Sequence, residues 1–305
     1  MSVSIAQFRT GELVVSHLYR EPQLLLYDRN AKYLRSYTKR GAGPGEFSST
    51  LHLVLDRNDT LYAFENLRVH RFDRELKHID TRSIEKGVQV NGVVLADGRM
   101  VVDDRVRTND RAVYTVQIVD REGQVTNTLE RVANAIAPTL LAPAADGRGF
   151  WTARRNETEL REYDSKGDLV RTVTVRPPWF TAWNQPIPGE PLSARPRPRN
   201  AEIMTISAHH VMLVTIEADS KWKPIVSGPP GKIMNPFELD GSAIWDTVVS
   251  AVDVRTANVI AQVRSPELLH AVEGGKGLVY STSANADGHV DVHIWQVELV
   301  SVRSR

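Results

Sequence analysis

The sequence Gly41-Ala-Gly-Pro-Gly-Glu-Phe47 is followed by three short apolar segments with turn residues between them. The segments are Leu51-His-Leu-Val-Leu55, Thr60-Leu-Tyr-Ala-Phe64 and Arg68-Val-His-Arg-Phe-Asp73. Each is about the length of a short strand and is rich in the β-branched and aromatic residues that a pleated sheet favours. This part of the chain is therefore predicted to form a glycine-rich turn and then three consecutive β-strands.

The last of these segments ends with an apolar or aromatic residue followed by aspartate, and the same pair recurs along the chain. It occurs at Tyr27-Asp28, Phe72-Asp73, Val119-Asp120, Tyr163-Asp164 and Val252-Asp253. The first four aspartates are 45, 47 and 44 residues apart, and the last two are 89 residues apart. Only one set of strand patterns fills the longer gap, so it is expected to hold one repeat with two insertions. A fixed period of this length indicates a repeat protein.

Each period has the same internal order of four short strands. In the second period the strands are predicted at residues 51–55, 60–64, 69–73 and 78–84. Turn dipeptides separate the predicted strands at Asp97-Gly98, Glu122-Gly123, Asp146-Gly147, Lys166-Gly167 and Asp287-Gly288. Such pairs suit the positive φ angles of tight hairpins. No segment shows a sustained helical period, so less than about a tenth of the residues is expected in helices.

Four-stranded repeats of about 40–45 residues are typical of β-propeller blades. Six such units fit into residues 1–305. The sequence therefore predicts an all-β chain that forms a single six-bladed β-propeller of four-stranded antiparallel blades. The two insertions, residues 177–200 and 220–246, fall in blade five. The last blade is expected to have a weak or missing outer strand, and the ring is expected to close mainly through side-chain packing between blades six and one.

The phrase around Gly41–Phe47, together with Leu61-Tyr62-Ala63 and Phe72-Asp73, resembles an NHL-type repeat. It is also similar to the corresponding phrase of bacterial six-bladed propeller proteins of unassigned function. The resemblance covers the whole chain at the level of repeats, and its motif is sharp only in blade two. It implies a propeller fold and an extracytoplasmic setting, periplasmic or secreted, and it implies no particular reaction. Residues 1–8 lack a basic region followed by an apolar run, so no signal peptide is expected in this chain.

Composition argues against several classes of function. The chain has 38 Lys and Arg against 37 Asp and Glu, a formal net charge of +1. This balance gives no overall field that would attract nucleic acid, so no nucleic-acid partner is expected, and Arg195–Arg199 is interpreted as a solvated loop. No apolar run is long enough for a transmembrane segment. Cysteine is absent, which excludes disulfides and thiolate chemistry. The sequence also lacks the fingerprints of P-loop, Rossmann and α/β-hydrolase enzymes.

Polar residues gather where the second strand of each blade is predicted to end. With the blades aligned, these ends fall at one level and are candidates for ligand binding: His17, Glu65, Asn66, Asp103, Arg154, Arg155 and Glu217. The alternative is that they only hydrate the channel, as polar loop ends do in any propeller. Trp183 and Trp222 lie in the two insertions. They are expected either to form an aromatic lid beside this polar ring or to pack on the rim.

Two functions remain open. The first is a binding scaffold that holds a small molecule, glycan or protein at one mouth of the channel and needs no cofactor. The second is a metal-dependent hydrolase or lyase at the same mouth, with His17, Glu65, Asp103 and Glu217 as ligands for calcium or zinc. Six-bladed lactonase-like enzymes hold calcium with Glu, Asn and Asp around the axis. Glu65, Asn66 and Asp103 match that set in residue type only, and no catalytic residue can be assigned.

Overall fold

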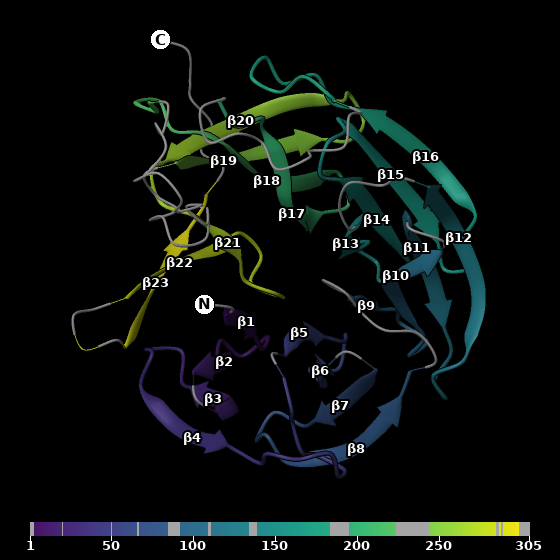
Figure 1. Ribbon diagram of the computed structural model, residues 1–305, viewed down its shortest axis with the longest axis vertical. Helices are drawn as coiled ribbons and strands as arrows, with labels where there is room; N and C mark the ends of the chain where they lie inside the picture. Colours follow the sequence, from purple (N-terminus) through teal and green to yellow (C-terminus); the bar gives the residue numbers. More distant parts are fainter. Residues whose placement is uncertain are drawn as a thin grey trace, which may run out of the picture.

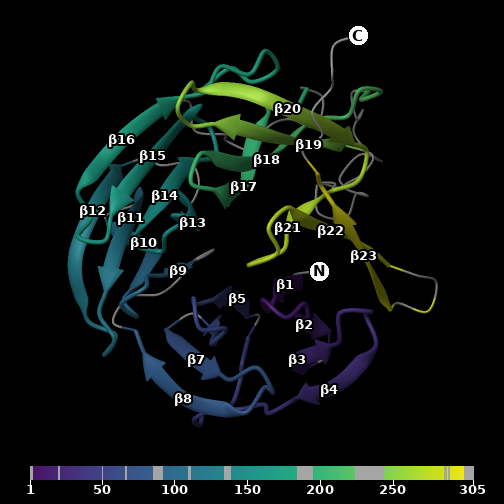
Figure 2. The same cartoon turned by 180° about the vertical axis from the view of Figure 1, so that it is seen from behind.

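The computed structural model has six antiparallel β-sheets arranged as blades around a central axis (Figures 1 and 2). It describes residues 3–19, 21–49, 51–65, 67–84, 92–108, 111–133, 139–183, 195–223, 244–284, 287 and 289–298. Within these residues every regular element is a strand. The predicted all-β six-bladed β-propeller is thereby confirmed.

The blades follow one another in chain order, and within each blade the first strand is innermost (Figure 1). Blade one comprises β1 Val3–Gln7, β2 Leu13–Tyr19, β3 Glu21–Tyr27 and β4 Tyr33–Tyr37. Blade two comprises β5 His52–Leu55, β6 Leu61–Glu65, β7 Arg68–Phe72 and β8 His78–Ser83. Blade three comprises β9 Gly92–Val94, β10 Met100–Thr108, β11 Arg111–Val119 and β12 Val125–Ala133.

The remaining three blades complete the ring. Blade four comprises β13 Thr139–Pro143, β14 Gly149–Arg154, β15 Glu159–Asp164 and β16 Leu169–Thr174. Blade five comprises β17 Arg199–Ser207, β18 His210–Ala218, β19 Trp245–Asp253 and β20 Asn258–Ser265. Blade six comprises β21 His270–Ala271, β22 Leu278–Ala284 and β23 Val290–Gln296, and it has three strands within the described residues.

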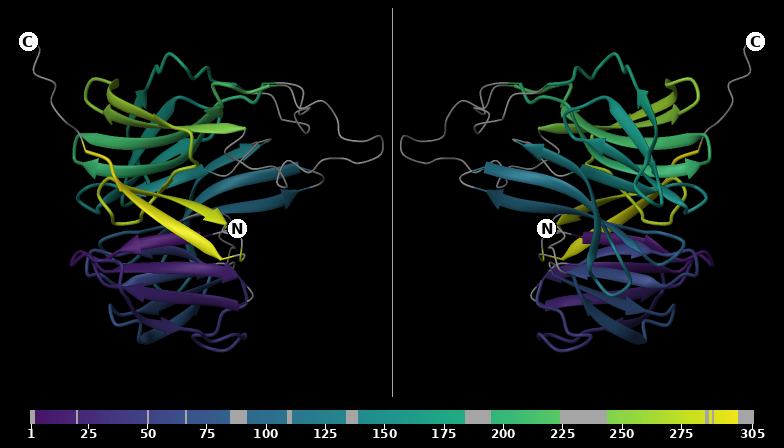
Figure 3. Two further views of the ribbon diagram at one scale, coloured as in Figure 1. Left: turned by 90° about the vertical axis from the view of Figure 1, so that its left-hand side faces the viewer. Right: turned by 90° about the vertical axis from the view of Figure 1, so that its right-hand side faces the viewer.

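The β10–β11 hairpin is longer than the sequence pattern predicts. The two strands pair without a break from Met100↔Val119 to Thr108↔Arg111. The sequence prediction ended the first of them at Asp103, where charged residues replace the apolar run. Backbone pairing continues past this point, and Figure 3 shows the hairpin extending beyond the neighbouring blades on one side.

Apolar side chains form six buried clusters, one at each junction between neighbouring blades. Alternation along the strands explains this arrangement, because successive side chains point to opposite faces of a sheet. Leu53 packs toward blade one and Val54 toward blade three. Val93 and Val94 divide in the same way between blades four and two. Consecutive apolar residues such as Leu53-Val54 and Val93-Val94 therefore occur on inner strands, because both faces of the blade are buried there.

The recurring aspartate is a turn-forming residue at the outer hairpins of blades one to four. In blade two, Oδ1 of Asp73 accepts hydrogen bonds from the N–H groups of Glu75 at 3.0 Å and Lys77 at 2.8 Å. In the same way, Asp28, Asp120 and Asp164 each accept hydrogen bonds from the backbone N–H groups two and four residues further along the chain. The side chain takes the place of a backbone partner in the turn. The repeat marker is thus explained by local hydrogen bonding.

The ring closes where blade six meets β1. The N–H of Gln7 donates to the carbonyl of Glu273 at 2.8 Å, and the N–H of Glu273 donates to the carbonyl of Ile5 at 2.9 Å. A cluster of four buried residues fills the same seam: Ile5, Leu13, Val272 and Tyr280. The seam therefore combines the expected side-chain packing with two backbone hydrogen bonds that the sequence pattern does not predict.

Candidate functional site

The innermost strands enclose a cavity of about 990 Å³ along the axis of the propeller. Its walls include the apolar side chains of Ile5, Leu53, Leu55, Leu141, Ala142 and Val272. A volume of this size, with apolar walls and a few convergent polar groups, is typical of sites that bind small molecules.

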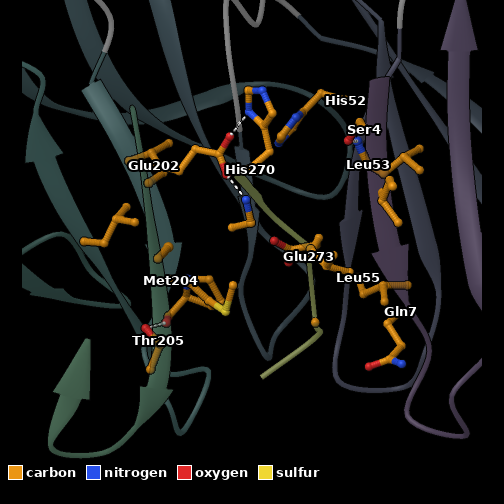
Figure 4. Close-up of a pocket in the computed structure, with 18 of the residues that line it drawn as sticks. Ser4, Gln7, His52, Leu53, Leu55, Glu202, Met204, Thr205, His270 and Glu273 are labelled. Carbon is orange, nitrogen blue, oxygen red and sulfur yellow. Dashed lines mark hydrogen bonds and ion pairs between the residues drawn. The ribbon is translucent and has the colours of Figure 1, made fainter. Parts of the chain in front are cut away.

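Two histidines and two glutamates line this cavity from three blades (Figure 4). His52 comes from β5, Glu202 from β17 and His270 from β21, while Glu273 lies just after β21. Each of them lies on an innermost strand or just after one, beside apolar residues. The arrangement of the blades around the axis therefore brings all four to the cavity. Together these residues are called the channel cluster below.

Glu202 and His270 form a hydrogen-bonded ion pair within the channel cluster. Nδ1 of His270 lies 2.7 Å from Oε1 of Glu202, and the second oxygen of Glu202 accepts the N–H of Ala271. Burial disfavours the charged imidazole, but the hydrogen bond and the charge of Glu202 outweigh it, so the pKa of His270 is raised. The side chain of His270 still keeps 43% of its surface accessible, because it faces the cavity.

His52 is a neutral partner in the same cluster. Burial lowers its pKa to about 4, and the nearby charge of Glu202 only partly opposes this effect. At neutral pH the ring is therefore uncharged and carries one hydrogen-bond donor and one acceptor. Figure 4 labels His52, His270 and Glu273 among the residues that line the cavity.

Glu273 is the most strongly perturbed carboxyl of the cluster. Burial raises its pKa to about 7, the charge of Glu202 adds to this, and a hydrogen bond with the backbone of Leu55 opposes it. Within the described residues no arginine or lysine forms an ion pair with it. Strongly perturbed titratable groups in a cavity are candidates for functional sites.

The predicted ligand-binding residue Glu65 has a different environment. It is buried, and one oxygen accepts hydrogen bonds from Ser48 Oγ at 2.7 Å and Ser49 N–H at 2.6 Å. The other contacts Arg68 Nη2 at 2.5 Å and His70 Nε2 at 3.3 Å. Burial would raise the pKa of Glu65, but these hydrogen bonds and the charge of Arg68 lower it overall. Its acceptor positions are thus occupied by protein groups.

Glu65 helps to hold the glycine-rich turn that joins blades one and two. Arg68, its ion-pair partner, also donates to the carbonyl of Ala42 at 2.7 Å. Gly45 has φ of 73°, and a Cβ atom there would lie 2.6 Å from the hydroxyl oxygen of Tyr37. That hydroxyl donates to the carbonyl of Gly45 at 2.9 Å. The Gly41–Phe47 phrase is therefore a packed connection between blades.

Other members of the predicted ring also link the chain to itself. Oδ2 of the buried Asp103 accepts the N–H of Thr139 at 3.1 Å, which joins blades three and four. Arg154 donates from Nη1 to Oε1 of Glu157 at 2.6 Å. The carbonyl of Arg155 accepts the N–H of Asn200 at 2.8 Å, which joins blades four and five.

Glu217 lies in an ionic cluster of blade five. It pairs with Arg264, whose Nε also lies 2.6 Å from Oδ2 of Asp246. Burial and the charge of Asp246 raise the pKa of Glu217, and the charge of Arg264 opposes them. Of the predicted residues whose side chains are described, Arg155 alone lines the channel cavity. The backbone of His17 pairs with Val3, while its side chain and Asn66 lie outside the described residues.

The tryptophans of the two insertions are held near the bases of these segments. Trp183 donates from Nε1 to the carbonyl of Pro198 at 2.9 Å, and its N–H donates to the carbonyl of Asn156 at 3.1 Å. The N–H of Trp222 donates to the carbonyl of Asp219 at 3.0 Å. Residues 184–194 and 224–243 lie outside the described residues. The aromatic lid therefore stays a prediction.

In the described part of the chain, no group of three or more His, Asp or Glu side chains is arranged to hold a metal ion. Nor do these residues include a helix with the length and apolar character needed to cross a bilayer.

The chain matches no protein-family model and no curated protein. Among solved structures it is similar to a protein of the exported class from Bacteroides fragilis, with a TM-score of 0.55, 8% identity, and coverage of 93% of this chain and 84% of the other. It is also similar to the calcium-binding protein regucalcin from Agrobacterium tumefaciens, with a TM-score of 0.53, 11% identity, and coverage of 93% and 83%. A third is a luciferin-regenerating enzyme, with a TM-score of 0.51, 9% identity, and coverage of 95% and 89%.

These similarities are far below 25% identity, so they support the six-bladed fold alone. No family hit confirms the NHL-repeat type. The channel cluster was missed at the level of sequence because the prediction concentrated on the ends of the second strands. A signal does exist on the first strands. His52, Glu202 and His270 are single polar residues flanked by apolar ones, in Leu51-His-Leu53, Ala201-Glu-Ile203 and Leu269-His-Ala271.

Proposed function

We propose that this protein is a small-molecule-binding β-propeller whose ligand occupies the central cavity. The observation that supports this most directly is the cavity of about 990 Å³, which combines apolar side chains with two histidines and two glutamates from three blades. Concave sites of this size bury most of a small ligand, whereas protein partners need a broad open surface. A small molecule is therefore favoured over a protein or a glycan chain.

We also infer an NHL-like repeat type and a periplasmic or secreted location. The Gly41–Phe47 phrase supports the first, because Glu65 and Arg68 hold it in a defined inter-blade turn. The second is supported by the resemblance to bacterial propeller proteins and by the similarity to a protein of the exported class. Fractionation of cells that express the natural full-length gene product tests the location. Recovery in the cytoplasmic fraction alone would contradict it.

Three probes of matched shape test the binding function: phenethylammonium, 2-phenylethanol and phenylacetate. Saturation-transfer NMR would detect binding of each to the wild-type protein. Gln7→Trp places a bulky ring in the cavity, since Gln7 lines it and its side chain is shown there in Figure 4. Gln124→Trp is the matched control, because Gln124 is exposed in an outer turn.

We expect at least one probe to bind the wild type and the Gln124→Trp protein, and to lose its signal with Gln7→Trp. Binding that persists unchanged in Gln7→Trp would place the site outside the cavity. Absence of binding by all three probes would contradict the proposed function. Circular dichroism of both variants would show that the fold is kept.

A second candidate is an enzyme that acts by general acid–base catalysis in the same cavity. The observation that favours it is the 2.7 Å contact between His270 and Glu202, since a carboxylate commonly orients a catalytic imidazole. Hydrolysis of γ-butyrolactone, followed by proton release, would test a lactonase-like reaction. Equal rates for the wild type and for His270→Asn would exclude this role for the pair.

A further inference from the structure

We propose that the channel cluster binds a small organic cation, a protonated amine on an apolar body, with Glu273 as its main counter-charge and Glu202 as a second. This rests on the proposed function, because it names the ligand class for the same cavity.

Glu202 is a source of negative charge for the inner part of the cavity. It is the charged group that acts on His52, His270, Glu273 and Tyr280. Within the described residues no arginine or lysine appears among the groups that shift these four. The inner cavity therefore favours positive charge.

The two carboxylates differ in how far they are already neutralised. Glu202 is paired with His270 and accepts the Ala271 N–H as well. Glu273 has the Leu55 backbone as its hydrogen-bond partner, and within the described chain it forms no ion pair. A charge in an apolar environment is costly unless it is paired. Glu273 can be neutralised by taking up a proton, as its raised pKa indicates, or by a ligand that supplies a cation.

Four cationic side chains also line the cavity wall: Arg9, Arg57, Arg155 and Lys276. Nε of Arg9 pairs with Asp59 at 3.3 Å. Arg57 and Lys276 are exposed. Arg155 follows the last residue of β14, at the end of the channel where the second strands finish, and its carbonyl bonds to Asn200.

Aromatic and apolar surfaces complete the site. The hydroxyl of Tyr280 donates to the carbonyl of Val3 at 2.7 Å, which fixes the ring, and the ring lies 5.3 Å from that of His270. Phe64 also lines the cavity. Aromatic faces attract ammonium groups, and the aliphatic walls suit an uncharged body. A primary or secondary amine also supplies the N–H donors that carboxylates and a neutral imidazole can accept.

The test is a comparison of dissociation constants by calorimetry at about pH 8, where Glu273 is largely ionised and the amine is still protonated. For the wild type we expect phenethylammonium to bind at least about tenfold more tightly than 2-phenylethanol, and phenylacetate to bind most weakly. Glu273→Gln keeps the shape of the side chain and removes its charge. It should weaken phenethylammonium binding about tenfold and change 2-phenylethanol binding by less than about twofold.

Glu162→Gln is the matched control, because Glu162 pairs with Arg171 at 2.6 Å on the outer strands of blade four and does not line the cavity. It should leave all three constants unchanged. If Glu273→Gln does not fold by circular dichroism, Glu202→Gln and the wild-type ranking of the three probes still decide the question, and Glu202→Gln is also expected to weaken the cation selectively.

Each result bears on a different claim. Equal or tighter binding of 2-phenylethanol or phenylacetate to the wild type would overturn the cation proposal and leave the small-molecule function intact. A preference for phenethylammonium that persists in both Glu273→Gln and Glu202→Gln would also overturn the cation proposal, because neither glutamate would then supply the counter-charge. Absence of binding by every probe would overturn the proposed function itself and the cation proposal with it.

Discussion

Gln7 and Glu273 are joined across the seam of the propeller by a hydrogen bond of 2.8 Å from the N–H of Gln7 to the carbonyl of Glu273. The same glutamate directs its carboxyl group into the cavity. Glu273 therefore takes part in closing the ring and is also the main counter-charge of the proposed ligand site. Occupation of the cavity and stability of the seam are expected to influence one another.

The Tyr280 hydroxyl gives a direct measure of the side-chain contribution to this seam. Tyr280→Phe removes its 2.7 Å hydrogen bond to the Val3 carbonyl and keeps the packed ring. We expect the free energy of unfolding to fall by about 1 kcal/mol. Urea denaturation measures it, with Tyr33→Phe as control because Tyr33 is 52% exposed on an outer strand. Equal losses in both variants would show that the seam bond contributes nothing specific.

Glu65 is predicted to act on stability. Glu65→Ala leaves Arg68, His70 and the Ser48 and Ser49 N–H groups without their shared acceptor. Loss of one partner from a buried ion pair commonly costs about 3 kcal/mol, and we expect a decrease of that order in the free energy of unfolding. Glu159→Ala is the control, since Glu159 is 40% exposed and its ion pair with Arg161 should contribute less than about 1 kcal/mol. A loss for Glu65→Ala no larger than that for Glu159→Ala would contradict the stabilising role of Glu65.

Glu273 should make stability depend on pH in a defined direction. Its pKa rises from the usual 4.5 to about 7 on folding, so the folded state favours the protonated carboxyl. Relative to Glu273→Gln, the wild type should be equally stable below about pH 4.5, lose stability as the pH rises toward 7, and change little above that. The full difference is on the order of 3 kcal/mol.

Chemical denaturation of the wild type and Glu273→Gln across this range checks the prediction. His52 also titrates, with its pKa lowered to about 4, but it is present in both proteins and cancels in the difference. A constant difference between the two curves would show that the carboxyl is not perturbed by folding.

The repeat aspartates are predicted to act through one oxygen and not through charge. Asp120→Ala removes the acceptor for the N–H groups of Glu122 at 3.0 Å and Gln124 at 2.8 Å. We expect a loss of about 1 kcal/mol in the free energy of unfolding. Asp120→Asn keeps an oxygen at the same position and should lose less than half as much. Similar losses for Ala and Asn would indicate a role for the charge.

The fold could be predicted because its determinants are local. Asp73 bonds to N–H groups two and four residues further along, so the marker records a turn wherever it recurs. Pairs such as Leu53-Val54 reveal strands with two buried faces. The strand ends were less predictable, since backbone pairing in the β10–β11 hairpin continues past Asp103.

The candidate site could not be predicted in the same way, because it depends on closure of the ring. His52, Glu202 and Glu273 belong to three blades and meet only around the axis. The ends of the second strands gave a misleading signal. In the sequence, a charged residue beside a loop that binds a ligand cannot be distinguished from one that binds a neighbouring strand. Glu65 and Asp103 hold backbone N–H groups of adjoining segments, a role that only their contacts reveal.

The small cluster at the seam has a consequence for the order in which the molecule assembles. Four buried residues fill the junction of blades six and one, whereas twelve fill that of blades one and two. Blades that are neighbours in sequence can dock as soon as both exist, but the seam must bring opposite ends of the chain together and bears the largest entropy of loop closure. We expect the seam to form last during folding and to open first under native conditions, so that amide exchange near Glu273 and Ile5 is faster than at other junctions. Temporary opening there would also give a ligand a route to the axis that bypasses both mouths.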